Sequence, residues 1–381
     1  MNESKVVLIR CETYDDDAVY DAVKRGVDLL GGIAKFVRPG EKILLKPNVL
    51  AGSPPEKCVT THPAVFKAVG RLLKAKDVKL YYGDSPGIGS IEGTLRRAGL
   101  KAVADDLGII LADFNSGRPV HHPKALQNKV LTIAHGALES DGLISLPKFK
   151  THGLTRFTGA VKNQFGCVPG ILKAQYHLKL ADAYQFGTLL ADINTLLKPR
   201  LYVMDGIMAM EGNGPRNGHP RAMNVLLFSS DPVALDAIAC KIIDMNPEFV
   251  PTSQPGERSG LGNDRFENIE VAGDPLDSFV AEDFDIVRRP PDVAAPRGIL
   301  ALIKNQVTSR PVIDHVKCTG CGICIKACPV GTKALTWDER NSKIPKHFYK
   351  HCIRCYCCQE MCPEGAITVE TPLLSRLIFR G

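Results

Sequence analysis

Eight of the thirteen cysteines fall in two short runs with the spacing of cluster-binding sequences. Both runs read Cys-x2-Cys-x2-Cys-x3-Cys-Pro without a departure. Three thiolates at this spacing can cover three irons of a [4Fe–4S] cubane, and the fourth lies so far along the chain that it crosses to the other cubane. The first cluster is therefore predicted to take Cys318, Cys321, Cys324 and Cys362. The second is predicted to take Cys352, Cys355, Cys358 and Cys328.

Two other kinds of site use cysteines at similar spacing. Pairs of the form Cys-x2-Cys also bind structural zinc, and cysteine-rich chains can be cross-linked by disulfides. Two complete four-cysteine runs, ending in Pro329 and Pro363, favour two [4Fe–4S] clusters over both alternatives. Cys357 stands beside a predicted ligand and outside the pattern, so we expect it to pack without binding iron.

The composition is that of an ordinary globular protein. The 381 residues suffice for one large and one small domain, and 44% of them are hydrophobic. No stretch approaches the roughly 18 apolar residues of a transmembrane helix, and the N-terminal residues carry no long apolar signal region. Many cysteines in cluster runs indicate a reducing compartment. We therefore expect a cytoplasmic protein without stable membrane insertion, from a cell living with little oxygen.

Positive charge is concentrated in one part of the chain. The net charge is +7, and residues 142–181 contain no aspartate or glutamate. Such a run presents a positive field to an anion. Because no nucleic-acid motif accompanies it, we expect a pocket for a phosphate or carboxylate rather than nucleic acid, with a solvated basic face as the alternative. The window contains Lys148, Lys150, Arg156, Lys162, Lys173 and Lys179, with His152 and His177.

Apolar strands and helices alternate through residues 1–283. Strands are expected near 5–11, 43–45, 78–82, 109–114, 143–146, 201–204 and 224–228. Helices are expected over 15–30, 63–74, 91–98, 182–197 and 231–243. This alternation predicts an α/β domain with a mainly parallel sheet flanked by helices.

The remaining residues are expected to form smaller parts. Residues 284–309 are rich in proline and arginine and are predicted to be a linker with a short helix near 298–307. Residues 310–371 hold the cysteine runs and are predicted to be a small α+β two-cluster domain. Residues 372–381 are an apolar tail.

Polar and glycine-rich segments follow several strands. The loop 83–89 follows a strand and precedes a helix, an arrangement that places backbone amides against an anion. Its glycines do not have the dinucleotide spacing, so a simple glycine turn is the alternative. The block 147–166 is dense in Lys, Thr, Asn and Gly, and is expected to be a binding loop at the end of the sheet. The segment 208–221 is also expected to be a loop.

These segments supply the candidate site residues. Amines and amides suit an anion, a histidine can move a proton near neutral pH, and carboxylates can act as acid or base or bind a metal. Each residue taken singly also fits a cap, a turn or a surface charge. The predicted substrate-binding residues are Lys46, Asn48, Lys148, Lys150, Lys162 and Asn163. The predicted catalytic residues are His152, Asp84, Asp205 and Glu211.

Two resemblances to known families rest on these motifs. The segments Leu45-Lys46-Pro47-Asn48, Gly83-Asp84-Ser85-Pro86-Gly87, 146–166 and 205–236 resemble the domain-of-unknown-function 362 family. That likeness covers most of 1–280 and implies no particular reaction. Residues 310–371 resemble bacterial-type two-cluster ferredoxins, which implies one-electron transfer and sensitivity to oxygen.

Together these features predict an iron–sulfur oxidoreductase. Two clusters would relay electrons between an external donor or acceptor protein and an anionic substrate or cofactor held by the N-terminal domain. One alternative is an electron carrier or adaptor that docks a partner enzyme, and another is a protein of cluster or cofactor assembly. A deep pocket lined by Lys46, Lys148, Lys162 and Asp205 would favour the oxidoreductase, and a flat face near the clusters would favour the carrier.

Overall fold

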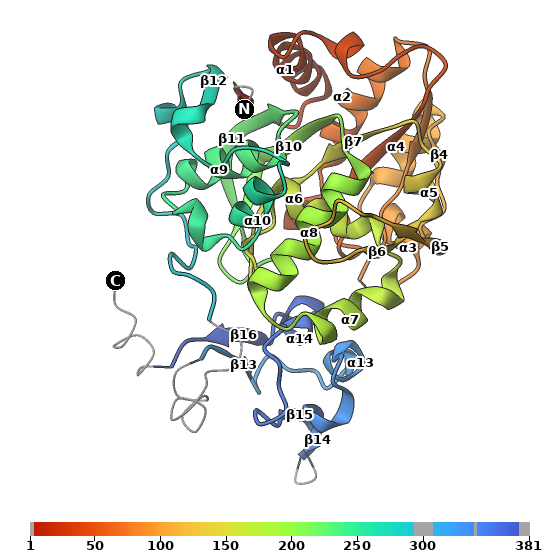
Figure 1. Cartoon of the computed structure of the whole chain (residues 1–381). Coiled ribbons are helices and arrows are strands. Elements are labelled where there is room, and N and C mark those ends of the chain that lie inside the picture. The colour runs from red at the N-terminus through yellow and green to blue at the C-terminus, as the bar shows by residue number, and fades with distance from the viewer. Residues whose placement is uncertain (1–3, 88, 293–307, 339–340, 373–381) are drawn as a thin grey trace.

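The computed structural model describes residues 4–87, 89–292, 308–338 and 341–372 (Figure 1). A large α/β body holds most of the chain, and a small C-terminal unit packs against one end of it. The helix predicted near 298–307 and nearly all of the tail 372–381 lie outside the described residues. Within the described residues, no helix is both long and apolar enough to cross a membrane.

A 10-stranded sheet runs through the large body, with the path β12-β1-β11-β10-β7-β2-β3-β4; β8 pairs with β10, and β9 pairs with β8. Only β11 is antiparallel to its neighbours on that path, and the other pairs are parallel. The predicted mainly parallel sheet is therefore confirmed. The strands are β1 (Ser4–Arg10), β2 (Lys42–Pro47), β3 (Lys79–Tyr82), β4 (Ile110–Leu111), β7 (Gly142–Leu146), β8 (Lys148–His152), β9 (Arg156–Phe157), β10 (Leu201–Glu211), β11 (His219–Ser229) and β12 (Ile269–Gly273). A separate antiparallel pair joins β5 (Gly117–His121) to β6 (Val130–Ala134).

Helices cover both faces of the sheet, because the central strands are apolar on both sides. In β1, Val7 and Ile9 belong to one core and Val6 and Leu8 to the other. Helices α1 (Asp16–Leu29), α2 (Pro63–Lys74) and α8 (Ala183–Leu197) pack on the first core, and α9 (Pro232–Ile242) packs on the second. The body also contains α3 (Ile91–Arg97), α4 (Leu100–Leu107), α5 (His135–Leu138), α6 (Gly159–Asn163), α7 (Gly170–Lys179) and α10 (Ser253–Arg258).

Two segments predicted to be loops are largely regular structure. Strand β10 continues to Glu211 and β11 begins at His219, so the predicted loop 208–221 shrinks to residues 212–218. In the block 147–166, all five residues of β8 are buried beside β10, and α6 follows. The polar residues of this block favour solvent-facing loops, but Lys148 and Lys150 are buried because Asp205 and Asn48 supply partners for their amines. Phe284, the first residue of the predicted linker, is fully buried in the second core.

The small unit has the predicted α+β character. Its antiparallel pairs are β13 (Arg310–Ile313) with β16 (Ile367–Glu370) and β14 (Leu335–Asp338) with β15 (Asn341–His347). Two short helices, α13 (Ile323–Ala327) and α14 (Cys357–Met361), lie on the side of the small unit that faces the large body, and the β14–β15 pair lies on the far side (Figure 1). The core of the unit is small and consists of Cys324, Leu335, Cys358, Cys362, Ala366 and Ile367.

Candidate functional site

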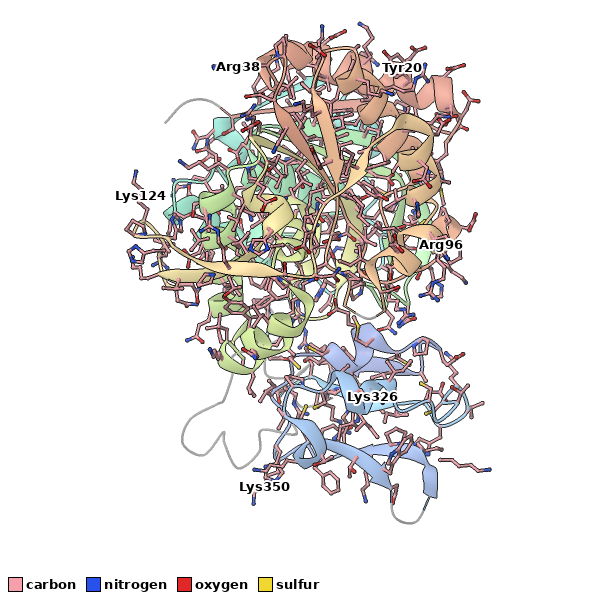
Figure 2. All side chains as sticks on the ribbon, turned by 90° about the vertical axis from the view of Figure 1, so that its right-hand side faces the viewer. Tyr20, Arg38, Arg96, Lys124, Lys326 and Lys350 are labelled. Atoms are coloured by element: carbon pink, nitrogen blue, oxygen red, sulfur yellow. The ribbon has the colours of Figure 1, made fainter. Side chains whose placement is uncertain are left out.

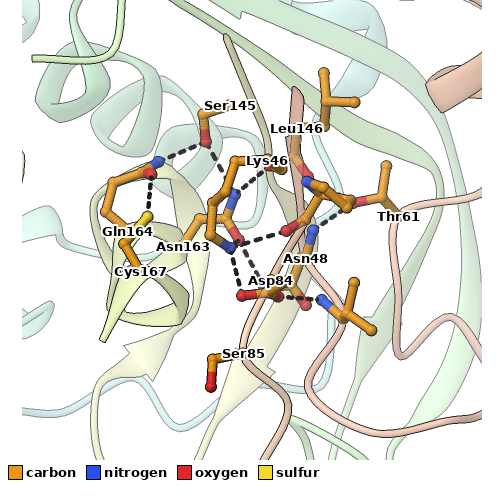
Figure 3. Close-up of polar contacts among 12 residues, drawn as sticks. Lys46, Asn48, Thr61, Asp84, Ser85, Ser145, Leu146, Asn163, Gln164 and Cys167 are labelled. Atoms are coloured by element: carbon orange, nitrogen blue, oxygen red, sulfur yellow. Dashed lines mark hydrogen bonds and ion pairs between the residues drawn. The ribbon is translucent and has the colours of Figure 1, made fainter. Parts of the chain in front are cut away.

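The carboxyl ends of β2 and β3 bring a buried ion pair to the edge of the sheet (Figure 3). Lys46 Nζ lies 3.0 Å from Asp84 Oδ1, and both side chains are at most 5% exposed. Lys46 also donates to Asn163 Oδ1 at 3.1 Å, and Asp84 Oδ2 accepts from the backbone of Val49 at 2.8 Å. Charges taken out of water need such partners on every side. The pair therefore fixes the loops after β2 and β3 to helix α6.

Gly166 lets the chain after α6 approach this pair. A Cβ added at Gly166 would lie 1.7 Å from Asp84 Oδ1 and 2.6 Å from Lys46 Nζ. Any side chain there would displace buried charges that cannot move without losing their partners. A glycine is therefore required at this position.

A second buried lysine holds Asn48. Lys150 Nζ donates to Asn48 Oδ1 at 2.8 Å and to the backbone oxygen of Val59 at 2.6 Å. Asn48 Nδ2 in turn donates to Asn163 Oδ1 at 3.1 Å. Burial, and after it the nearby charge of Lys162, holds the pKa of Lys150 well below its ordinary value. The predicted residues Lys46, Asn48, Asp84, Lys150 and Asn163 thus form one connected network.

A cavity of about 650 Å³ opens beside this network, between the sheet edge and the small unit. Its volume is in the range of small-molecule and cofactor sites. Five of the predicted site residues line it, and Lys46 lies directly behind Asp84. The lining includes Asn48, Asp84, Lys150, Lys162 and Asn163.

The cavity presents positive charge to whatever enters it. Among the described residues, no group forms a hydrogen bond or ion pair with the side-chain amine of Lys162, so this amine is available to a ligand. Burial lowers the pKa of Lys162 and lowers that of Lys173 to about 8. An anion placed between these amines would restore their charge, because an opposite charge favours the protonated form.

Two polar atoms of the lining that are themselves closed off from solvent make no hydrogen bond or ion pair within the described chain. They are Thr158 Oγ1 and His177 Nδ1, from residues that are 3% and 7% exposed. Burial lowers the pKa of His177 to about 3, so its ring is neutral at physiological pH. Buried polar groups are normally hydrogen-bonded, so these atoms indicate that the cavity is built for a polar occupant.

Besides Lys46, four predicted residues lie outside the lining of this cavity: Lys148, Asp205, Glu211 and His152. Lys148 Nζ pairs with Asp205 Oδ2 at 2.7 Å, and both side chains are fully buried between β8 and β10. Asp205 also accepts from Tyr14 Oη at 2.8 Å and from the backbone of His62 at 2.9 Å. Glu211 lies at the end of β10 and accepts from the backbone of Asp285 at 3.1 Å. The ion pair therefore supports the sheet, and the structure does not bring these residues to the cavity.

His152 lies behind the cavity wall. Its Nδ1 accepts from the backbone of Leu154 and Thr155 at 3.1 and 3.3 Å, and its Nε2 is 3.7 Å from Glu360 Oε2. Burial holds its pKa well below the ordinary value, so the ring is neutral. Of these two residues, Glu360 lines the cavity.

The cysteines of the small unit surround two separate cavities of about 20 Å³ each. Apolar residues such as Leu335 and Ala366 form much of the remaining walls, together with Thr319, Glu364 and His347. In the described chain, no group of three or more Cys, His, Asp or Glu is arranged to hold a single metal ion. Thiols spread around a volume fit a cubane better than one zinc, whose ligands converge at about 2.3 Å. One cavity is lined by Cys318, Cys321, Cys324 and Cys362, and the other by Cys328, Cys352, Cys355 and Cys358.

The two helices of the small unit separate these cysteine cavities from the large cavity. Each helix carries or ends on one cysteine of each set: Cys324 and Cys328 for α13, Cys358 and Cys362 for α14. Ile323, Lys326, Ala327, Cys357, Glu360 and Met361, from the same two helices, line the large cavity. One layer of helix therefore stands between the cysteine sets and the lysines.

The loop 212–218 between β10 and β11 holds the small unit in place. Gln359 of α14 donates to Asn213 Oδ1 at 2.7 Å and to the backbone oxygen of Gly214 at 3.0 Å. Arg216 donates to Met361 O at 2.9 Å, and Asn217 donates to Cys362 O at 3.0 Å. These contacts hold α14 in its position beside the cavity.

Replacing Gln359 with leucine is expected to loosen this attachment. The change leaves buried carbonyl oxygens without donors, at a cost of about 1–3 kcal/mol. Hydrogen exchange of 212–218 and of α14 should become faster while iron content stays unchanged. Gln127, exposed on the large body, provides the control as Gln127→Leu; equal exchange in both variants would contradict the attachment.

Several lining residues were not among the predicted site residues. Lys173 and His177 belong to the acid-free window, and Ser85 belongs to the glycine loop 83–89, so their segments carried a signal. Cys357 and Glu360 come from the small unit. No pattern in the chain connects them with the strand ends more than 150 residues earlier, because the docking of the small unit brings them there.

In comparison with known proteins, different families match the large body and the small unit. The family model of the domain of unknown function DUF362 matches residues 43–241, and that of a 4Fe-4S dicluster domain matches 310–363. The thylakoid-associated protein sll1697 of Synechocystis is 34% identical over 303 residues, which are 79% of this chain and 94% of that protein.

Other similar proteins match much shorter stretches of this chain. An uncharacterized ferredoxin of Methanocaldococcus jannaschii is 37% identical over 59 residues, 16% of this chain and 75% of its own. The pyruvate synthase subunit PorD of the same organism is 41% identical over 71 residues, 17% of this chain and 77% of its own. A distant structural match, with a TM-score of 0.40 and 12% identity over 64% of this chain and 57% of the other, is to a lactate racemase apoprotein from Thermoanaerobacterium thermosaccharolyticum. The chain belongs to the DUF362 family and carries a ferredoxin-type 4Fe-4S dicluster domain, which supports a role in electron transfer.

Proposed function

We propose that this protein is an iron–sulfur oxidoreductase in which two [4Fe–4S] clusters exchange electrons with an anionic substrate or cofactor held in the 650 Å³ cavity. Cys318, Cys321, Cys324 and Cys362 would hold one cluster. Cys328, Cys352, Cys355 and Cys358 would hold the other. Each cluster, when bound, supplies or accepts one electron at a time. A separate donor or acceptor protein would exchange electrons with the clusters.

This proposal rests on the wall that the large cavity shares with the two small cysteine-lined cavities. Helices α13 and α14 contribute side chains to the large cavity and cysteines to both small ones. Cys357, which lines the large cavity, is adjacent in sequence to Cys358 of the second set. A molecule in the large cavity would therefore lie within a helix width of both clusters. A carrier that only docks partners needs no lysine-lined cavity at this place.

The residues in and around the cavity would have different roles. Lys162 and Lys173 would bind the negative charge of the occupant, because both line the cavity and an anion there would favour their protonated form. Asn48 and Asn163 are held by Lys150 and Lys46 and would orient it. Asp84 is occupied by Lys46 and by Val49, so it would position the loops rather than move a proton. Lys148 and Asp205 would act as a structural pair.

Replacing Lys162 with glutamine tests the anion site. The reconstituted anaerobic protein is titrated with benzoate and with phenyl phosphate, which share an apolar ring and differ in their anionic group. The anion that binds wild type should bind Lys162→Gln about tenfold more weakly, since a charge-assisted hydrogen bond is worth about 1.5–3 kcal/mol. The EPR spectrum of the reduced clusters should not change.

Lys124→Gln is the matched control, because Lys124 is exposed on the large body away from the small unit (Figure 2). Binding of neither anion, or equal affinity in wild type and Lys162→Gln, would contradict the proposal.

A further inference from the structure

One corner of the cavity brings together three hydrogen-bond donors from the loop after β3 and the start of α7. Ser85, Gly170 and Lys173 all line the cavity. A Cβ added at Gly170 would lie 3.4 Å from Ser85 Oγ, and Lys173 Nζ donates to the backbone oxygen of Ser85. The first turn of α7 and the Ser85 hydroxyl are therefore immediate neighbours.

Within the described residues, the backbone N–H of Gly170 at the start of α7 has no hydrogen-bond partner, whereas that of Leu172 donates to Pro169 O at 3.0 Å. This 10-residue helix follows Pro169 and has no side-chain cap, so the N–H of Gly170 has no partner from a capping residue. The start of a helix carries partial positive charge as well as unpaired N–H groups. Lys173, in the same first turn, adds a full cation whose amine keeps two further hydrogens after its bond to Ser85.

A second, independent observation is the state of the Ser85 side chain. Ser85 is only 4% exposed, and in Figure 3 its hydroxyl points away from the Lys46–Asp84 network and makes no contact with the residues drawn. Its backbone N–H is already used by Gly166 O at 3.0 Å. Among the described residues the Ser85 hydroxyl makes no hydrogen bond, although a polar side chain that is more than nine-tenths buried normally makes one. Nδ1 of His177, two turns further along the same helix, is another buried polar atom of the lining without a hydrogen-bond partner in the described chain.

We propose that the occupant is an organic phosphate whose phosphoryl group binds at the corner formed by Ser85, the N-terminus of α7 and Lys173. This inference rests on the proposed function and names the chemical class of its anion. A phosphoryl group has three terminal oxygens that accept from different directions, as the hydroxyl, the backbone N–H and the amine require. The cavity is far larger than a free phosphate, so an organic portion would extend from the corner toward Lys162 and α14.

The same pair of probes tests the class of anion. Cluster-loaded protein should bind phenyl phosphate at least tenfold more tightly than benzoate. Ser85→Ala and Lys173→Gln should each weaken phenyl phosphate binding about tenfold and change benzoate binding less. Lys179→Gln is the control, since Lys179 is exposed at the far end of the same helix and lies outside the lining. Iron content and circular dichroism of every variant should match wild type, which shows that the variants fold.

The outcomes separate this inference from the proposed function. If benzoate binds as tightly as phenyl phosphate in a Lys162-dependent manner, the phosphate corner is wrong and the anion site stands. If phenyl phosphate binds tightly but Ser85→Ala and Lys173→Gln match Lys179→Gln, the corner is also wrong. If neither probe binds, both proposals fall.

Discussion

Replacing Cys358 with alanine is expected to remove one cluster and much of the order of the small unit. Wild type should contain about eight irons per chain, and the variant about four or fewer, because each cubane holds four. Cys358 also belongs to the small core, in which three of the six side chains are cysteines of the two sets. Removing a metal centre from so small a core removes folding free energy directly, since cluster binding and folding are coupled. Iron, acid-labile sulfide and EPR of the reduced protein measure the loss.

The neighbouring Cys357 makes this experiment selective. Cys357→Ala changes the same helix by the same atoms, but Cys357 lines the large cavity rather than either cysteine cavity. This variant should keep about eight irons. A full iron content in Cys358→Ala, or an equal loss in Cys357→Ala, would show that the cluster uses a different set of four thiolates.

Replacing Lys148 with methionine is expected to destabilise the large body without affecting the cavity. The change leaves Asp205, which is 0% exposed, without its cation. Removing one partner of a buried pair costs about 3–5 kcal/mol, because the remaining charge stays in a poorly polarisable surrounding. Tyr14 and the backbone of His62 still donate to Asp205, but neither carries a charge to balance it. Urea unfolding of the anaerobic protein measures the difference.

An exposed pair on the same sheet provides the comparison. Lys5 lies 2.8 Å from Glu270, with side chains that are 35% and 47% exposed, so Lys5→Met should cost less than about 1 kcal/mol. The double change Lys148→Met with Asp205→Leu should recover part of the loss, since no unpaired charge remains. Equal stability of Lys148→Met and Lys5→Met would disprove the structural role of the buried pair. Phenyl phosphate affinity should be unchanged in Lys148→Met.

Much of the architecture was predictable because it depends on local periodicity. Helices such as α1 and α9 begin at Asp15 and Asp231, whose carboxylates accept from the first turn, and such caps are visible in a sequence. The strand predicted near 201–204 is shorter than β10, because Asp205 and Gly206 are residues typical of a turn. The partner that makes an aspartate acceptable inside a strand, Lys148, is 57 residues away, and local patterns do not show such pairs.

The sequence by itself determined which cysteines could share a cluster, that a parallel sheet precedes them, and that an acid-free window carries the basic residues. The cysteine sets follow from spacing, and the window follows from composition. Tertiary structure alone decided which lysines pair inside the protein and which face the large cavity. Lys148 and Lys150 share one face of β8, yet one pairs with Asp205 and the other holds Asn48. The cavity itself exists only because the loop 212–218 docks α14 against the strand ends, and contacts between residues so distant in the chain depend on the whole fold.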